Sequence, residues 1–449
     1  MPGKVSIGYV PLIIQNGDLL GGKFTQAEKA WCLYDWANSS FVTTVVAAVL
    51  PVFFVGVVCG SGPVTLRFPG FEFTSNSQSL WGYAMSLAAL LVAIGAPIFG
   101  AVADAGGKRK LFLGIMTVTG IIASALLFFS GPGLVGFTLA VVILGQIGFA
   151  GANVFYNSLL VYVTPPSRRD IISSRGFAMG YLGGGLLLAL NLLMIKQPGL
   201  FGIPEGTLAV RLSFLTVALW WGGFSIPLFK KVPEEEKSSS ISFIRSLRQG
   251  ITSLAVTFRS LKQHKNAFRF LLSFLLYNDG IQTIIMMATV FGKAELGLDS
   301  SHLIGALLLT QFIGFPGSIY YGRLAGKLGS RKALLVGLAG YIAVVLYAWR
   351  MTETWQFWIL AGAVGLLQGG VQAISRSFYS VLIPREHASE YFGFFSISSR
   401  FASILGPLMF AVIGDITGST RNSIISISVF FIAGGILLLT VKDHGNQHA

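Results

Sequence analysis

Twelve apolar stretches of bilayer-spanning length recur along this 449-residue chain, and they limit the folds open to it. A hydrocarbon core about 30 Å thick needs about 20 predominantly apolar residues in a helix. Within that core each backbone polar group needs a partner inside the protein, and a helix provides it within one segment. The stretches fall near residues 30–58, 79–103, 111–130, 134–162, 175–196, 209–229, 267–292, 303–325, 333–349, 356–383, 391–416 and 421–441. The sequence therefore predicts an all-α polytopic membrane protein with about twelve transmembrane helices.

A polar interval separates the first six stretches from the last six. Inside it, apolar residues recur at helical spacing from Ile241 to Phe258, and Lys and Arg occupy the other face. This pattern predicts an amphipathic helix at the membrane surface, and a flexible linker is the alternative. The predicted organisation is an N-terminal segment (1–24), a six-helix unit (25–229), the interval (230–266), a second six-helix unit (267–441) and a tail (442–449).

The distribution of Lys and Arg predicts the orientation of the chain. With a cytoplasmic N-terminus, 24 of the 32 Lys and Arg residues fall in cytoplasmic segments and 6 in external ones, and Arg376 and Arg400 fall inside helices. Because basic loops resist translocation, both termini are expected in the cytoplasm. The net charge of +14 is then explained by contact with anionic lipid, and no nucleic-acid partner is expected.

The two halves of the chain repeat each other at an offset of 222 residues. Gly100–Lys110, which reads GAVADAGGKRK, aligns with Gly322–Lys332, which reads GRLAGKLGSRK. The same offset pairs Gln146 with Gln368. A constant register favours a duplicated six-helix unit, and parallel repeats of this kind are one way in which transporters build alternating access.

Glycines, one acid and a basic run combine in Gly100–Lys110, directly after the second stretch. This loop resembles a signature of the major facilitator superfamily, in which it forms a charge-relay clamp that helps to set the inward- or outward-facing state. Asp104 and Arg109 match the acidic and basic positions, whereas the second copy keeps Arg331 but has Gly326 in place of the acid. The resemblance implies two pseudo-symmetric six-helix bundles, with Asp104, Arg109 and Arg331 as conformational clamp residues.

Four longer motifs lie in predicted helices: WCLYDWANS at Trp31–Ser39, LYNDGIQT at Leu276–Thr283, GGVQAISRS at Gly369–Ser377 and MGYLGG at Met179–Gly184. They resemble the vacuole-effluxer branch of the same superfamily, the permeases related to an autophagy-linked vacuolar amino-acid exporter. The resemblance runs from about residue 27 to residue 440. It implies a secondary transporter, a permease or effluxer of a small solute, with amino acids as the first candidates.

Four charged side chains lie inside predicted helices, where a charge costs at least about 2.5–3.5 kcal/mol. They are Asp35, Asp279, Arg376 and Arg400, in the first, seventh, tenth and eleventh stretches. We predict that Arg376 pairs with the carboxylate of a small zwitterion and Asp279 with its ammonium group, and Asp279 is also a candidate proton carrier. For Asp35 and Arg400, an inner gate or a helix–helix contact stands beside a role in the substrate site.

Uncharged polar residues form stripes on the fourth, seventh and tenth helices, which with the first line the central cavity in the major facilitator family. The candidates for substrate binding among them are Gln146, Asn153, Asn157, Gln282 and Gln372. Side chains at i, i+4 and i+7 share a helix face, so these stripes suit a cavity wall, with contacts between helices as the alternative. Trp31, Tyr34 and Trp36 are interpreted as anchors at the membrane interface.

Catalytic chemistry is not indicated, because the sequence shows no nucleophile with a base, no metal-ligand spacing and no phosphate-binding loop. No enzyme activity, metal or cofactor is therefore expected. A facilitator for a sugar, an organic anion or a drug stays open, as does a non-transporting receptor or scramblase. The expected partners are the solute, protons and the bilayer, and a monomer is expected. Short loops favour a bacterial inner membrane over a vacuolar membrane.

Overall fold

The computed structural model describes residues 23–60, 62–68, 70–234, 264–402 and 404–442. Within these ranges twelve helices are long and apolar enough to cross a membrane, which confirms the predicted number of spans. The predicted amphipathic helix at 241–258, the tail from residue 443 and nearly all of the segment 1–24 lie outside the described residues.

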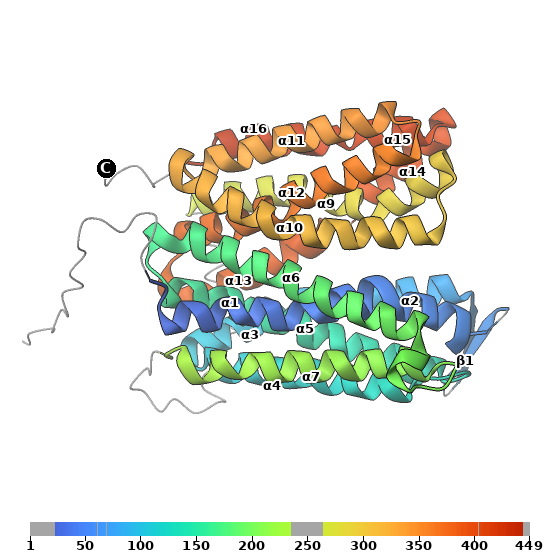
Figure 1. Ribbon diagram of the computed structural model, residues 1–449. Coiled ribbons are helices and arrows are strands. Elements are labelled where there is room, and N and C mark those ends of the chain that lie inside the picture. Colours follow the sequence, from blue (N-terminus) through green and yellow to red (C-terminus); the bar gives the residue numbers. More distant parts are fainter. Residues whose placement is uncertain (1–22, 61, 69, 235–263, 403, 443–449) are drawn as a thin grey trace, which may run out of the picture.

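The first six spans form one bundle, drawn in blue to green in Figure 1. The first span joins α1 (Gln26–Ser40), a π-helical stretch (Phe41–Val49), α2 (Leu50–Phe53) and a second π-helical stretch (Phe54–Val58). The other five are α3 (Ser77–Gly106), α4 (Arg109–Leu126), α5 (Val135–Val163), α6 (Arg169–Lys196) and α7 (Leu208–Lys231). A capping box between Thr25 and Glu28 starts α1, because each side chain accepts a hydrogen bond from the other residue's backbone N–H.

The last six spans form the second bundle, drawn in yellow to red in Figure 1. They are α9 (Lys265–Leu296), α10 (Ser300–Leu328), α11 (Ser330–Arg350), α12 (Thr354–Leu382), α13 (Ala388–Phe401) with α14 (Leu405–Thr417), and α15 (Thr420–Ser426) with α16 (Ser428–Leu439). The eleventh span, expected as one helix over 391–416, is therefore broken between α13 and α14. Pro407 lies in the first turn of α14, where its ring and its missing N–H disfavour a continuous helix through the preceding turn.

The structure also contains a two-stranded hairpin, which the sequence did not predict. β1 (Val64–Phe68) pairs antiparallel with β2 (Phe71–Ser75) between the first and second spans, with Val64 opposite Ser75. The hairpin projects from one end of the molecule, which we call the hairpin end (Figure 1).

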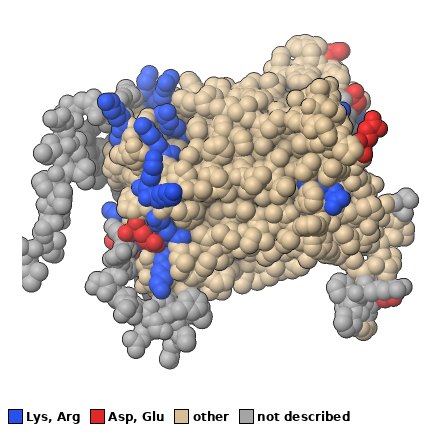
Figure 2. All heavy atoms as spheres, turned by 60° about the horizontal axis from the view of Figure 1, so that its bottom comes forward, with Lys and Arg blue, Asp and Glu red and all other residues tan. Residues whose placement is uncertain are grey.

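Lys and Arg gather at the opposite end of the molecule, as Figure 2 shows. We call this the basic end, and it carries Lys108–Lys110, Arg168, Lys230–Lys231 and Arg331–Lys332 at the ends of the spans. Between the two ends the surface is apolar, with large side chains such as Leu90, Ile94 and Ile122 exposed. An apolar belt of this kind is expected of a protein whose outer surface contacts lipid.

The bundles contact each other most extensively through two pairs of helices. α6 packs along α10, and α3 packs against α13. Within the N-terminal bundle, α4 and α5 approach so closely that a Cβ on Gly148 would lie 2.5 Å from the backbone nitrogen of Gly120 and 2.8 Å from the carbonyl oxygen of Met116. Small residues allow membrane helices to approach in this way.

We expect Gly148→Ala to destabilise the fold by about 1–3 kcal/mol, because the new methyl group meets backbone atoms that have no rotamer with which to move aside. Gly326→Ala is the matched control, since a Cβ there meets nothing within 4 Å. Thermal unfolding of the purified protein in detergent, followed by tryptophan fluorescence, measures both. Equal unfolding midpoints for the two variants would show that α4 and α5 can move apart to accept the methyl group without loss of stability.

Candidate functional site

A cavity of about 550 Å³ lies between the two bundles. Its wall extends from Asp35 and Arg376 to Leu303 and Phe357, which lie near the starts of α10 and α12 at the hairpin end. Seven of the predicted site residues line it: Asp35, Asn153, Asn157, Gln282, Gln372, Arg376 and Arg400. The stripes predicted on the fourth, seventh and tenth helices therefore meet in one place.

An ion pair between the bundles forms the floor of the cavity. Arg376 on α12 donates from Nη1 to Oδ2 of Asp35 on α1 at 3.1 Å, and both residues are buried. The same guanidinium donates to Asn157 Oδ1 at 3.2 Å, to Ser173 Oγ at 2.9 Å and to the Ser173 carbonyl at 2.8 Å. Every hydrogen-bond partner named here belongs to the N-terminal bundle, so this one side chain joins the two halves.

Three aromatic rings surround the Arg376 guanidinium. Its Cζ lies 4.3 Å from the ring centre of Phe177, 4.7 Å from that of Trp31 and 5.5 Å from that of Tyr156. Such ring faces attract a cation. Trp31 and Tyr34 are fully buried, and Trp31 stacks on Tyr156, so their interpretation as membrane-interface anchors was wrong. The polar atoms of both find internal partners, which is what allows these side chains to be buried.

Asp279, expected to face the solute together with Arg376, lies elsewhere. Its Oδ1 accepts a hydrogen bond of 2.9 Å from the backbone N–H of Gly406, so it caps the start of α14. Its neighbours Asn278 and Gln282 line the cavity instead. Consecutive residues of a helix point about 100° apart, so the face that presents Asn278 to the cavity turns Asp279 towards α14.

Gln146 is also absent from the cavity wall. Its Nε2 lies 3.5 Å from the sulfur of Met85, between α5 and α3. Asn153, two turns further along α5, lines the cavity and accepts a hydrogen bond of 3.0 Å from Asn38. The polar stripe of the fourth helix is thus divided between a helix contact and the cavity.

The first span contributes more to the wall than its sequence indicated. Asn38, Ser39, Val42, Thr43 and Ala47 line the cavity beside Asp35. Val42, Thr43 and Ala47 belong to the π-helical stretch, whose wider winding changes which side chains share a face. The helical periodicity used to predict the wall did not anticipate this stretch.

The basic end is closed by hydrogen bonds between the bundles. Arg169 donates to the Ser380 carbonyl at 2.7 Å, the hydroxyl oxygens of Ser158 and Ser389 lie 2.9 Å apart, and Tyr162 donates to the Arg385 carbonyl. On the α6–α10 side, Asp170 accepts hydrogen bonds from Ser330, at 2.7 Å, and from Ser377. We call this set of contacts the seam.

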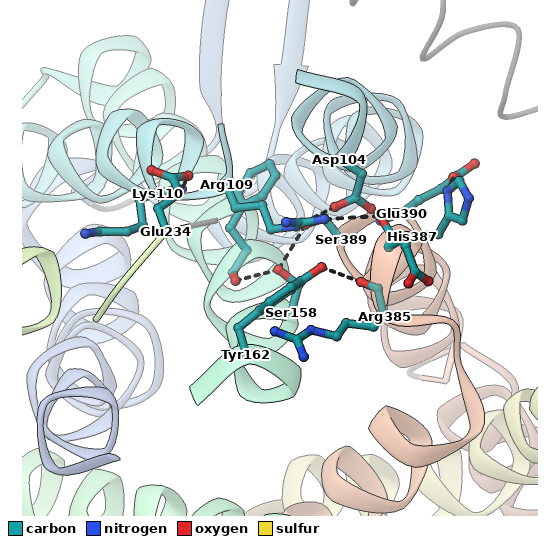
Figure 3. Close-up of polar contacts among 12 residues, drawn as sticks. Asp104, Arg109, Lys110, Ser158, Tyr162, Glu234, Arg385, His387, Ser389 and Glu390 are labelled. Carbon is teal, nitrogen blue, oxygen red and sulfur yellow. Dashed lines mark hydrogen bonds and ion pairs between the residues drawn. The ribbon is translucent and has the colours of Figure 1, made fainter. Parts of the chain in front are cut away.

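The predicted clamp residues Asp104 and Arg109 lie within the seam, as Figure 3 shows. Arg109 Nε donates to Asp104 Oδ1 at 2.7 Å, and Arg109 Nη2 donates to the Glu386 carbonyl at 3.1 Å. The second oxygen of Asp104 accepts from the backbone N–H of Glu390 at 2.9 Å. Asp104 thus caps the start of α13 from the other bundle, where a carboxylate also suits the helix dipole.

Close backbone contact beside Asp104 keeps this cap in place. A Cβ on Gly100 would lie 2.5 Å from the carbonyl oxygen of Ser389. Glycine is therefore required where α3 crosses the start of α13.

Arg331, expected as a third clamp residue, does not take part in the seam. Its Nη1 donates to the carbonyl of Val441 at 2.9 Å, at the end of α16 in its own bundle. The position that matches Asp104 is Gly326, so the second loop has no carboxylate to hold the guanidinium, which turns to helix-end carbonyls.

Comparison with known proteins identifies the family of this chain. The family described as "Vacuole effluxer Atg22 like" matches residues 25–164 and 163–448. YxiO of Bacillus subtilis (strain 168), described as an uncharacterized MFS-type transporter, is 37% identical over 424 residues, which cover 94% of this chain and 96% of YxiO. Autophagy-related protein 22 of Eremothecium gossypii is 24% identical over 453 residues, which cover 90% of this chain and 88% of the relative.

Solved structures share the fold. The human organic anion transporter MFSD10 superposes with a TM-score of 0.69 at 15% identity, covering 92% of this chain and 99% of its own. The proton:xylose symporter XylE, a major facilitator superfamily protein, gives a TM-score of 0.67 at 14% identity, covering 93% and 96%. The fold is therefore that of the major facilitator superfamily, as the repeat and the loop signature predicted.

We expect Asp35→Asn to lower the stability of the protein by about 3–5 kcal/mol, because it leaves the buried Arg376 guanidinium without its counter-charge. The double variant Asp35→Asn/Arg376→Gln is expected to lose less stability than the two single variants lose together, since it removes both charges. Thermal unfolding in detergent measures the cycle. Asp415→Asn, at an exposed acid on α14, is the control. Additive effects of the two changes would contradict a coupled pair.

Proposed function

Because the chain belongs to the vacuole effluxer Atg22-like family of the major facilitator superfamily, we propose that it carries a small zwitterion, with amino acids as the first candidates. Its relatives are transporters, so the chain is a small-molecule transporter of the bilayer and not an enzyme. The composition of the cavity wall carries the proposal for the cargo. One acid, Asp35, and two guanidiniums, Arg376 and Arg400, line it among carboxamides and hydroxyls.

The proposed assignment of charges differs from the pairing predicted from the sequence. Asp279 caps α14, so Asp35 is the acid that an ammonium group in the cavity would meet. A cavity of about 550 Å³ has room for a solute of amino-acid size together with water. Charge-assisted hydrogen bonds to both ends of such a solute would select it over a neutral sugar.

The proposed mechanism is rocking of the two bundles around the cavity. The seam closes the basic end, and the cavity extends towards the hairpin end. Opening the basic end requires the Asp35–Arg376 pair and the Asp104 cap to separate, because both join the two bundles. A solute whose ammonium group pairs with Asp35 would replace Arg376 there, and this exchange links loading of the cavity to release of the seam. A proton on Asp35 would have the same effect, which supports proton coupling as part of the proposal.

The proposed orientation places the basic end in the cytoplasm. The concentration of Lys and Arg at that end supports it, since basic loops resist translocation. The structure is then the outward-facing state. The membrane we propose is a bacterial inner membrane, supported by the 37% identity to a Bacillus subtilis protein over nearly the whole chain.

Exchange of labelled amino acids across proteoliposome membranes tests the proposal. We expect counterflow of a tritiated amino-acid mixture, and we expect an imposed pH gradient to change its rate. Protein that is shown to be folded but gives no counterflow with amino acids would contradict the proposed cargo. The same liposomes then receive sugars, organic anions and drugs, which separates a wrong cargo from a protein that does not transport.

A reversible lock on the seam tests the mechanism independently of the cargo. Ser158 and Ser389 are buried with their hydroxyls 2.9 Å apart, so the double variant Ser158→Cys/Ser389→Cys is expected to form a disulfide in a background with Cys32 and Cys59 replaced by Ser. Oxidation should abolish exchange and reductant should restore it, because the basic end can no longer open. Each single cysteine variant is the control. Full exchange by the cross-linked protein would rule out opening at this seam.

A further inference from the structure

A guanidinium lies on the cavity wall close to the break in the eleventh span. α13 ends at Phe401 and α14 begins at Leu405, and Arg400 lies in the last turn of α13. Arg400 lines the cavity together with Phe395, Ser396 and Ser399, which share its helix face. The polar part of this face is thus a cation flanked by two hydroxyls.

Arg400 differs from the other guanidinium of the cavity in having no partner. Among the residues that the structure describes, none forms a hydrogen bond or an ion pair with its side chain. Arg376, in contrast, is satisfied by Asp35, Asn157 and Ser173. Arg400 is half-buried, and a charge without a counter-charge is costly in a membrane protein, so an anion in the cavity would stabilise Arg400.

Asp279, the other acid within a span of the C-terminal bundle, is held at the start of α14 by one oxygen, and its Oδ2 is buried without a hydrogen-bond partner among the described residues. Asp279 Oδ1 holds the backbone N–H of Gly406 and thereby caps α14. This capping also means that a carboxylate already occupies the positive end of the α14 dipole, so Arg400 remains the cation with which an anion in this part of the cavity would pair.

A second group of the cavity also lacks a partner. The side-chain nitrogen of Asn278 on α9 is buried, and it has no hydrogen-bond acceptor among the described residues. Asn278 lines the same cavity as Arg400. Asn278 Nδ2 is thus a buried donor without an acceptor, and Arg400 is a half-buried donor on the same cavity wall.

We propose that Arg400 and Asn278 bind the carboxylate of the transported solute. The inference rests on the proposed transport function and deepens it, because it names the end of the solute that the C-terminal bundle holds. A carboxylate supplies two acceptor oxygens, which suits the forked donors of a guanidinium. The carboxylate then lies against the C-terminal bundle while the ammonium group faces Asp35 of the N-terminal bundle, so the solute bridges the two halves.

Equilibrium binding to the purified protein tests this without requiring transport. The probe is a tritiated amino-acid mixture, competed by each unlabelled amino acid and by its carboxyl amide, which keeps the ammonium group and removes the charge from the carboxyl end. We expect each amide to compete at least about tenfold more weakly than its acid, the loss expected for one charge-assisted hydrogen bond. Equal competition by acids and amides would overturn the proposal.

Variants identify the residue responsible. Arg400→Gln should remove most of the difference in affinity between the acid and its amide, and Arg400→Lys should keep part of that difference. Asn278→Ala should lower the affinity for the acid by a smaller factor. Arg323→Gln, the same change at an exposed guanidinium on α10, is the matched control and should bind as the wild type does. Partial rescue by Lys shows that the fold survives at this position. If Arg400→Gln weakened acid and amide equally, the role of Arg400 would be structural and the proposal would fail.

A second panel separates this inference from the proposed cargo. It contains mono- and dicarboxylates without an amino group, with thermal stabilisation as the readout. Stabilisation that is lost in Arg400→Gln would support the carboxylate site even where amino acids do not bind. If no carboxylate of either panel binds the wild type, the proposal fails, whereas transport of another solute would leave alternating access intact.

Discussion

The contact between the two bundles depends on one requirement. A guanidinium buried inside a membrane protein needs a counter-charge and hydrogen-bond acceptors beside it. Arg376 of the C-terminal bundle meets this requirement through Asp35, Asn157 and Ser173, all of which belong to the N-terminal bundle. The balance of charge at the cavity floor therefore holds only while the two bundles are in contact. The ion pair at the cavity floor and the seam at the basic end therefore both require the two bundles to be in contact.

The architecture could be predicted because its signals are local or periodic. The length of each apolar stretch predicted the twelve spans, and the register of Gly100–Lys110 with Gly322–Lys332 predicted two related bundles. Seven of the nine candidate cavity residues line the cavity for a similar reason, since a polar stripe on a helix records which face avoids lipid. The break before α14 also had a local signal in Pro407, which the apolar length of the stretch concealed.

The pairing of the charges could not be predicted, because it depends on how each helix is rotated. Asp35 and Asp279 are both acids within spans, and only the packed bundles show that the first meets Arg376 and the second meets Gly406. The burial of Trp31 and Tyr34 could not be predicted for the same reason. An aromatic residue near the end of a span suits the membrane interface as well as an internal stack, and a neighbour far along the chain, Tyr156, decides between them.

Much of the seam is made by side chains of the N-terminal bundle with backbone groups of the C-terminal one. Arg109, Tyr162 and Arg169 donate to carbonyls, and Asp104 accepts from a backbone N–H. Backbone groups near the end of α12 and the start of α13 are free for this purpose because helix ends leave them without intrahelical partners. The seam thus constrains side-chain identity in the N-terminal bundle and backbone position in the C-terminal bundle. The identities of residues 380, 385 and 386 are free to drift, as far as these bonds are concerned, while the length of the connection that presents them is not.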